Sequence, residues 1–384
     1  MTQLPPAIGG PEHRARLAKA QSLMAEHGVH AVVLTAGTSL RYFTGLVWGL
    51  SERLLAAVVP REGDPVYVVP AFEEPKVREL LVVEGEVRGW EEHESPFALV
   101  ARQLVDAPRG GGRLAIEATA PLFMAEGLRD AASGWEVTSA APIVDACRMH
   151  KSPAEIAIIR YAMGVTLDIH QRVRDELYPG ISNVEVVERI DRLHRQAGSD
   201  SGSTFAIVAF GESTAFPHGP KGEQRLQAGE TVLVDTGCTF HGYHSDLTRT
   251  YVFGEPTPRQ REFWDIERDA QLAAFNAARL GAPCEAVDAA ARAVLQKRGL
   301  GPGYQTPGLP HRTGHGLGLD IHEPPYLVKG NTTPLAEGMV ASIEPMIVSY
   351  GEMGVRLEDH FVMTDAGPRW VTEPSPSLGS PFGG

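Results

Sequence analysis

The pattern of apolar and polar positions predicts an α/β arrangement in the first third of the chain. An amphipathic stretch over 12–27 predicts a helix that ends at Gly28. Short apolar runs predict strands at 30–35, 54–59, 66–69 and 113–116, with polar helical segments between them. This alternation of strands and helices favours a small α/β domain, to which we assign residues 1–145.

Helix start signals mark the beginning of a second part. The segment 139–153 is interpreted as a boundary, and it ends in Ser152, Pro153 and Glu155, a capping box with proline in the first turn. Similar signals occur at Ser182 and at Thr257. The helices predicted from these signals, and from the glycines that follow them, cover about 153–176, 182–198, 257–281 and 285–298.

Antiparallel strands are predicted between and after these helices. The apolar runs lie at 205–210, 231–235, 245–253, 339–348 and 355–363. The pattern of two helices followed by strands therefore occurs twice, which indicates an approximate internal duplication. We expect a second domain over 150–384 of the α+β class, with helices packed on a curved antiparallel sheet.

Composition and charge narrow the function classes. Apolar residues make up 43% and charged residues 22%, as in ordinary globular proteins. The net charge of −13, without a block of Lys or Arg, argues against nucleic-acid binding. No apolar run approaches the roughly 18 residues of a membrane span, and the first residues contain no apolar signal segment, so we expect a cytoplasmic protein with no membrane partner. The three cysteines are an odd number, which excludes a disulfide framework, and they have no metal-ligand spacing.

Two carboxylate pairs are the informative polar residues. Asp235 ends an apolar strand, where an unpaired buried carboxylate is unfavourable. The midpoint between Asp235 and Asp246 lies beside the turn-like segment 240–242. If a hairpin tip lies there, the two side chains face each other across the strands.

The same arithmetic applies to Glu344 and Glu358, whose midpoint is Gly351. Like charges placed opposite each other are destabilising, so two such pairs are difficult to explain by structure alone. Four clustered carboxylates carry a charge of −4, which two divalent cations would balance. His315 would complete the set as a nitrogen ligand.

At these residues the sequence resembles the metallopeptidases of the pita-bread fold, which include prolidase, aminopeptidase P and methionine aminopeptidase, with the non-peptidase relative creatinase. The motifs are VDTG at Asp235, SDLTRT at Asp246, HRTGHGLGLDIHEPP around His315, IEP at Glu344 and RLED at Glu358. They cover about 150–370. The first 140 residues are similar to the creatinase/prolidase-like N-terminal domain only in size and α/β pattern. Methionine aminopeptidases lack a large N-terminal domain, which favours the proline-specific branch.

The resemblance implies a dinuclear metal centre. Asp235 would bind one metal, His315 and Glu344 the other, and Asp246 and Glu358 would bridge both. Oxygen ligands with one imidazole suit Mn²⁺, with Co²⁺ or Zn²⁺ as alternatives. A water or hydroxide between the two ions would be the nucleophile, with Glu344 as its proton acceptor.

The resemblance also implies roles for residues that surround the metal ligands. His218 and His322 match histidines that contact the scissile carbonyl and the tetrahedral intermediate in prolidases and aminopeptidases P. Arg356 is expected to point to the same face as Glu358, where it would pair with Asp246 or with a substrate carboxylate.

Tyr326 lies four residues after His322, where some prolidases carry an arginine for the carboxylate of a dipeptide. A phenol would make a weaker, uncharged contact there. Arg312 or Arg356 would compensate for the missing arginine. The group that binds the substrate carboxylate is therefore left open by the sequence.

These features predict a hydrolase, an Xaa-Pro dipeptidase that acts on small peptides with proline second and forms a homodimer. The first alternative is an aminopeptidase P, which would release the N-terminal residue of longer peptides. The second is a creatinase-like C–N hydrolase, and the third is a metal-free binding scaffold on the same fold. The complete set of five ligands argues against both of these last alternatives.

Overall fold

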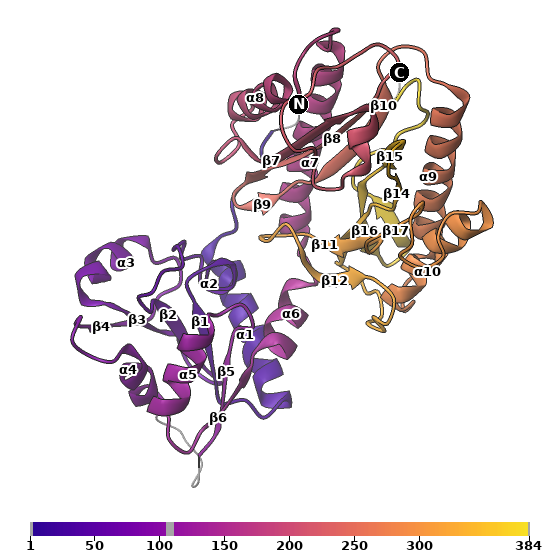
Figure 1. The fold of residues 1–384 in the computed structure, drawn as a ribbon. Helices are drawn as coiled ribbons and strands as arrows, with labels where there is room; N and C mark the ends of the chain where they lie inside the picture. Colours follow the sequence, from indigo (N-terminus) through magenta and orange to yellow (C-terminus); the bar gives the residue numbers. More distant parts are fainter. Residues whose placement is uncertain (1–2, 105–110, 383–384) are drawn as a thin grey trace. The chain divides into compact units, whose positions relative to one another are not determined.

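The computed structural model describes residues 3–104 and 111–382, and the chain forms two compact units (Figure 1). One unit spans Ile8–Arg148, and the other spans Met149–Gly384 together with Met1–Ala7. The mixture of helices and sheets confirms the α+β class. Within the described residues, no helix is both long and apolar enough to cross a membrane.

The unit of residues 8–148 contains one six-stranded mixed sheet in the order β4-β3-β2-β1-β5-β6. Every residue of the central strand β1 is buried, so helices and loops cover both of its faces. The strands are β1 (Ala31–Thr35), β2 (Ala56–Pro60), β3 (Val66–Pro70), β4 (Glu86–Trp90), β5 (Arg113–Ile116) and β6 (Glu136–Ser139). The helices are α1 (Gly10–Glu26), α2 (Thr38–Thr44), α3 (Glu74–Leu80), α4 (Pro96–Arg102), α5 (Leu122–Ala131) and α6 (Ala141–Arg148). Helix α6 occupies part of the segment that we had interpreted only as a boundary.

Three helices of the larger unit begin at predicted capping boxes, and all three boxes are formed. Ser152 caps α7, Ser182 caps α8 and Thr257 caps α9, each through reciprocal bonds with the residue three positions later. The helices are α7 (Pro153–Asp175), α8 (Asn183–Gln196), α9 (Pro258–Ala277) and α10 (Cys284–Lys297). Local hydrogen bonds therefore set these starts, as the sequence indicates.

The described residues of this unit also form three antiparallel sheets, in the orders β10-β8-β7 with β9 paired to β8, β12-β11-β13-β16-β17, and β14-β15. Their first strands are β7 (Ser203–Phe210), β8 (Thr231–Phe240), β9 (Tyr243–His244) and β10 (Leu247–Val252). The later strands are β11 (Gly314–Gly316), β12 (Glu323–Leu327), β13 (Val340–Ile343), β14 (Met346–Ser349), β15 (Met353–Arg356), β16 (Asp359–Thr364) and β17 (Gly367–Trp370). Helix α7 packs on β8, and α9 packs on β13, β14 and β15.

The two long strands predicted at 339–348 and 355–363 are each divided in two. The first is interrupted at Glu344 and Pro345, because proline has no N–H to continue the ladder. The second is interrupted at Leu357 and Glu358, where the N–H of Glu358 donates to the carbonyl of Thr248 in the neighbouring sheet. These interruptions fall at two of the predicted ligands.

Candidate metal centre

The first predicted carboxylate pair lies on the hairpin of β8 and β10. Asp235 is opposite Thr248, and Asp246 is therefore offset from Asp235 by two residues. The prediction that the two aspartates face each other directly is wrong. The hairpin tip is the two-residue loop His241–Gly242, with φ of 50° and 78°, which moves the register from that expected. Diagonal neighbours of this kind still lie within side-chain reach on one face of a sheet.

The second pair behaves as predicted. The strands β14 and β15 are joined around Gly351, with Ser349 opposite Met353. The same register continues beyond the interruption, where Ile343 is opposite Asp359. Glu344 and Glu358 therefore lie opposite each other in the gap between the paired segments.

Backbone hydrogen bonds hold this gap open. The N–H of Glu344 donates to the Thr313 carbonyl at 2.8 Å, and the N–H of Glu358 donates to the Thr248 carbonyl at 3.1 Å. The hydroxyl of Thr248 also donates to Oε2 of Glu358 at 2.9 Å. Glu358 is thus attached to the first hairpin, so the two carboxylate pairs meet at one site.

His315 reaches the same site from the short strand β11. Its Nε2 lies 3.0 Å from Oε1 of Glu344 and 3.7 Å from Oδ2 of Asp246. Its Nδ1 is 3.0 Å from the Gly316 carbonyl, and a proton held on Nδ1 would leave Nε2 able to bind a cation beside the carboxylates. A Cβ atom at Gly314 would lie 2.0 Å from the Ser342 carbonyl, so the strand before His315 accepts only glycine.

The carboxylates lie close to one another, and all are buried except Glu344, which is partly buried. Burial and then the neighbouring carboxylates raise the pKa of Asp246 and of Glu358 well above the ordinary values. Burial also raises the pKa of Asp235. Burial opposes the charged form of Glu344 too, but the effect of the nearby His315 is larger and opposite. The pKa of Glu344 therefore lies below the ordinary value.

The donor set fits divalent cations. Oδ1 of Asp235 and Oε1 of Glu358 are buried and have no hydrogen-bond partner among the described residues. Cations would satisfy both oxygens and relieve the repulsion between the carboxylates. The five predicted ligands line one cavity of about 420 Å³. The structure therefore brings all five together.

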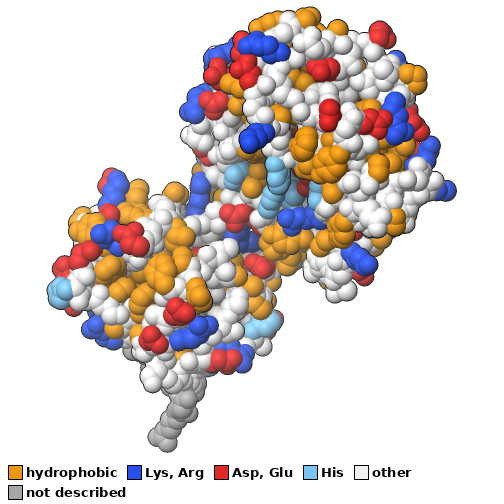
Figure 2. Space-filling view, viewed as in Figure 1, with side chains coloured by type: hydrophobic (Ala, Val, Ile, Leu, Met, Phe, Trp, Pro, Cys, Tyr) orange, Lys and Arg blue, Asp and Glu red, His pale blue; other side chains and the backbone are white. Residues whose placement is uncertain are grey.

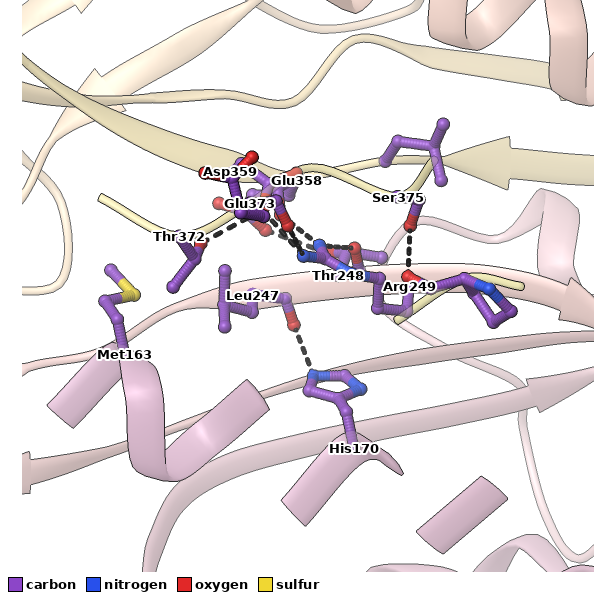
Figure 3. Close-up of polar contacts among 12 residues, drawn as sticks. Met163, His170, Leu247, Thr248, Arg249, Glu358, Asp359, Thr372, Glu373 and Ser375 are labelled. Carbon is purple, nitrogen blue, oxygen red and sulfur yellow. Dashed lines mark hydrogen bonds and ion pairs between the residues drawn. The ribbon is translucent and has the colours of Figure 1, made fainter. Parts of the chain in front are cut away.

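A buried ion pair between Arg249 and Asp359 holds the backbone at Glu358 in place (Figure 3). Arg249 donates to the Glu358 carbonyl at 2.8 Å and to Oδ1 of Asp359 at 2.6 Å, and both partners of the ion pair are fully buried. Asp359 points away from the carboxylate cluster because successive side chains of a strand alternate. This arrangement holds the backbone on both sides of the predicted bridging residue.

Histidine side chains gather on one face of the larger unit, as Figure 2 shows. His218 and His322 both line the cavity and both are exposed to solvent. The rings of His322 and His315 have centroids 4.0 Å apart. Partial burial, followed by the proximity of His315, lowers the pKa of His322 to about 4, so this imidazole is neutral at neutral pH.

The two candidate arginines have different surroundings. Arg356 donates through Nη2 to Asp235 and through Nε to Thr248, so its partner is Asp235 and not the expected Asp246. Arg312 lines the cavity and stacks on the ring of Tyr326, 4.4 Å from the ring centroid. Tyr326 is not among the described residues that line the cavity.

Two histidines near the site were absent from the sequence-based list. His311 lines the cavity, and its Nε2 is buried without a partner among the described residues. His360 is fully buried, and burial lowers its pKa well below the ordinary value. Its position two residues after Glu358 is the signal that strand periodicity offers.

Comparison with known proteins agrees with this geometry. Residues 157–365 match the model of metallopeptidase family M24, and residues 16–150 match the creatinase/prolidase N-terminal domain. The chain belongs to metallopeptidase family M24. The M24 match covers the four carboxylates and the histidine described above.

Individual M24 relatives cover nearly the whole chain. The probable dipeptidase PepE of Mycobacterium tuberculosis is 37% identical over 92% of each chain. The crystal structure of the dipeptidase PepE from Mycobacterium ulcerans has a TM-score of 0.89 and 36% identity, covering 97% of this chain and 99% of that one. The recombinant prolidase from Thermococcus sibiricus has a TM-score of 0.84 and 31% identity, covering 94% and 97%.

Proposed function

We propose that this M24 protein is a metal-dependent Xaa-Pro dipeptidase. The observation that carries the proposal is the convergence in one cavity of the His315 nitrogen, three buried carboxylates and the partly buried Glu344, with two carboxylate oxygens unpartnered within the described residues. The names of its relatives, dipeptidase and prolidase, support the substrate class. The cavity volume of about 420 Å³ is within the usual range for small ligands.

Each ligand has a proposed place in a two-metal centre. Asp235 would bind one ion, His315 and Glu344 the other, and Asp246 and Glu358 both. The hard oxygen donors favour Mn²⁺, with Co²⁺ and Zn²⁺ as alternatives. When bound, such ions polarise a peptide carbonyl and make water a nucleophile near neutral pH.

The remaining residues handle protons and charge. Glu344 is proposed to accept the proton of the attacking water, since its pKa lies below the ordinary value and it is charged at neutral pH. His322, neutral because its pKa is about 4, would donate a hydrogen bond to the oxyanion that forms at the scissile carbonyl. His218, which lines the same cavity, would act together with it.

Arg312 is the proposed anchor for the free carboxylate of a dipeptide. A buried carboxylate needs a cation or several donors, and Arg356 is already bound to Asp235. Arg312 makes no ion pair with any described residue, and Tyr326 supports the flat face of its guanidinium. Tyr326 would thus act through Arg312. The apolar side chains that line the same cavity, and that suit a proline ring, are Phe205, Ile207, Ile321 and Tyr350.

The test is a comparison of kcat/KM for Ala-Pro, Ala-Leu and Ala-Pro-Ala with Mn²⁺ added. We expect Ala-Pro to be cleaved fastest. Faster cleavage of Ala-Leu would contradict proline specificity. Faster cleavage of Ala-Pro-Ala would identify an aminopeptidase P, the alternative function. We also propose a cytoplasmic homodimer, which cell fractionation and analytical ultracentrifugation would test.

A further inference from the structure

The strand that follows Glu358 brings a second imidazole to the carboxylate cluster. His360 lies in β16, opposite Ser342 in β13. Directly paired residues of an antiparallel sheet point to the same face, and Ser342 donates to Oε1 of Glu344 at 3.3 Å. His360 and Glu358 are also two residues apart, which places both side chains on one side of the strand.

The distances agree with this register. One nitrogen of His360, one carboxylate oxygen of Asp246 and one of Glu358 all lie within 4.8 Å of one another. Ligand atoms that share one ion are at most about 4.4 Å apart, given metal–ligand distances of about 2.0–2.2 Å. Movements of a few tenths of an ångström would therefore allow all three to bind the same cation.

Neither nitrogen of His360 has a hydrogen-bond partner among the described residues, although the side chain is fully buried. Buried histidines with a structural role normally have a partner. In the same unit, Nε2 of His170 lies 3.0 Å from the Leu247 carbonyl, and Nδ1 of His194 lies 3.1 Å from the Ile190 carbonyl. His360 differs from both because its unpartnered nitrogens lie beside two carboxylates.

His360 also approaches from the protein interior. His322 is exposed at the cavity, whereas His360 has no exposed surface. Its ring centroid is 6.2 Å from that of His315, so the two imidazoles are neighbours. A ligand in this position would leave the solvent side of the centre available for substrate.

We propose that His360 is a sixth protein ligand of the metal centre and supplies a second imidazole nitrogen to it, at an ion held by Asp246 and Glu358. This inference rests on the two-metal centre of the proposed function. An additional neutral nitrogen donor would raise the affinity of this site for its ion. It would also favour Co²⁺ or Zn²⁺ over Mn²⁺, relative to a five-ligand centre.

The test compares the wild-type protein with His360→Gln, which removes the imidazole, and with His194→Gln, a control that removes an equally buried histidine elsewhere in the unit. Metal-free protein is titrated with Co²⁺, and calorimetry and the visible absorption spectrum of the bound ion are recorded. We expect His360→Gln to weaken one of two Co²⁺ sites at least about tenfold and to change its spectrum, with the control unchanged.

Two results would overturn the inference. One is an unchanged affinity and spectrum in His360→Gln. The other is a weaker site with an unchanged spectrum, since His360 would then act as a hydrogen-bond donor to a carboxylate. If the wild-type protein itself binds no metal, the proposed function fails instead.

A second measurement does not depend on whether the His360→Gln variant folds. In His322→Gln, which alters an exposed residue, X-ray absorption of the zinc-loaded protein counts the imidazoles that remain bound. We expect two, from His315 and His360. A count of one would exclude His360 as a ligand.

Discussion

Arg356 forms an ion pair with Asp235, the carboxylate that resemblance to the family assigns to a single metal. The guanidinium is buried, and desolvation opposes its charge, but Asp235 and the neighbouring carboxylates raise its pKa above the ordinary value. Arg356 therefore neutralises and orients a proposed ligand and is not available to a substrate. This relationship leaves Arg312 as the cation for recognition of a dipeptide.

Replacing Arg312 with methionine should raise KM for Ala-Pro by about 10–100-fold, because a hydrogen bond to a charged group contributes about 1.5–3 kcal/mol. Steady-state kinetics with Ala-Pro and with Ala-Pro-amide would measure this, and the amide should change less than threefold. Tyr326→Phe is the matched control, since the ring under Arg312 remains. Equal losses on both substrates would show that Arg312 does not bind the carboxylate.

Removal of metal should abolish hydrolysis. Treatment with a chelator, followed by dialysis, should reduce activity to background, and Mn²⁺ or Co²⁺ should restore it, because the buried donors would otherwise lack the ions that activate water. Metal content is measured in parallel by elemental analysis. Full activity in a demonstrably metal-free sample would contradict the proposed mechanism.

Glu358→Ala should lose one or both metals. Glu358 is proposed to bind both ions, and without it the three remaining carboxylates have fewer cations to balance their repulsion. Elemental analysis should find fewer than two metals per chain. Glu352→Ala, which removes an exposed glutamate from the tip of the nearby hairpin, should retain two. Two metals in both variants would show that Glu358 is not a bridge.

His218→Ala and His322→Ala should each lower kcat by about 10²–10³ while metal content stays unchanged, because each removes a donor to the developing oxyanion. His150→Ala is a control, since its ring contacts the Glu337 carbonyl and does not line the cavity. Metal loss in either active-site variant would identify that histidine as a ligand. This outcome is informative for His322, whose nitrogen lies close to Asp246 and His315.

His170 should make stability depend on pH. Burial, followed by the charge of Arg249, lowers its pKa to about 3 in the folded protein, against about 6.5 when unfolded. As the pH falls, the unfolded state therefore binds a proton at a higher pH than the folded state does. Unfolding free energy is lost as the pH falls below about 6.5. Between pH 7.5 and 5.0, the metal-free protein should lose about 2 kcal/mol more unfolding free energy than His170→Gln. Urea titrations at both pH values would measure the difference, and identical pH dependence would contradict it.

The sequence by itself determined the local features of this protein. The starts of α7, α8 and α9 follow from capping boxes, in which residues three positions apart bond to each other whatever the rest of the fold does. It also singled out Asp235, because a carboxylate at the end of an apolar strand is unfavourable without a partner, and the motifs that resemble the family named the other four residues that line the same cavity. The opposed positions of Glu344 and Glu358 followed from a turn centred on Gly351.

Only the tertiary structure decided how these local features meet. The register that places Asp235 opposite Thr248 depends on the left-handed conformation of His241 in the hairpin tip, and apolar patterning does not specify this conformation. The partner of Arg356 depends on contact between two sheets that are distant in the sequence. The approach of His360 to Asp246 has the same origin. Long-range contacts of this kind arise when separate sheets pack against each other, so residue spacing along the chain does not encode them.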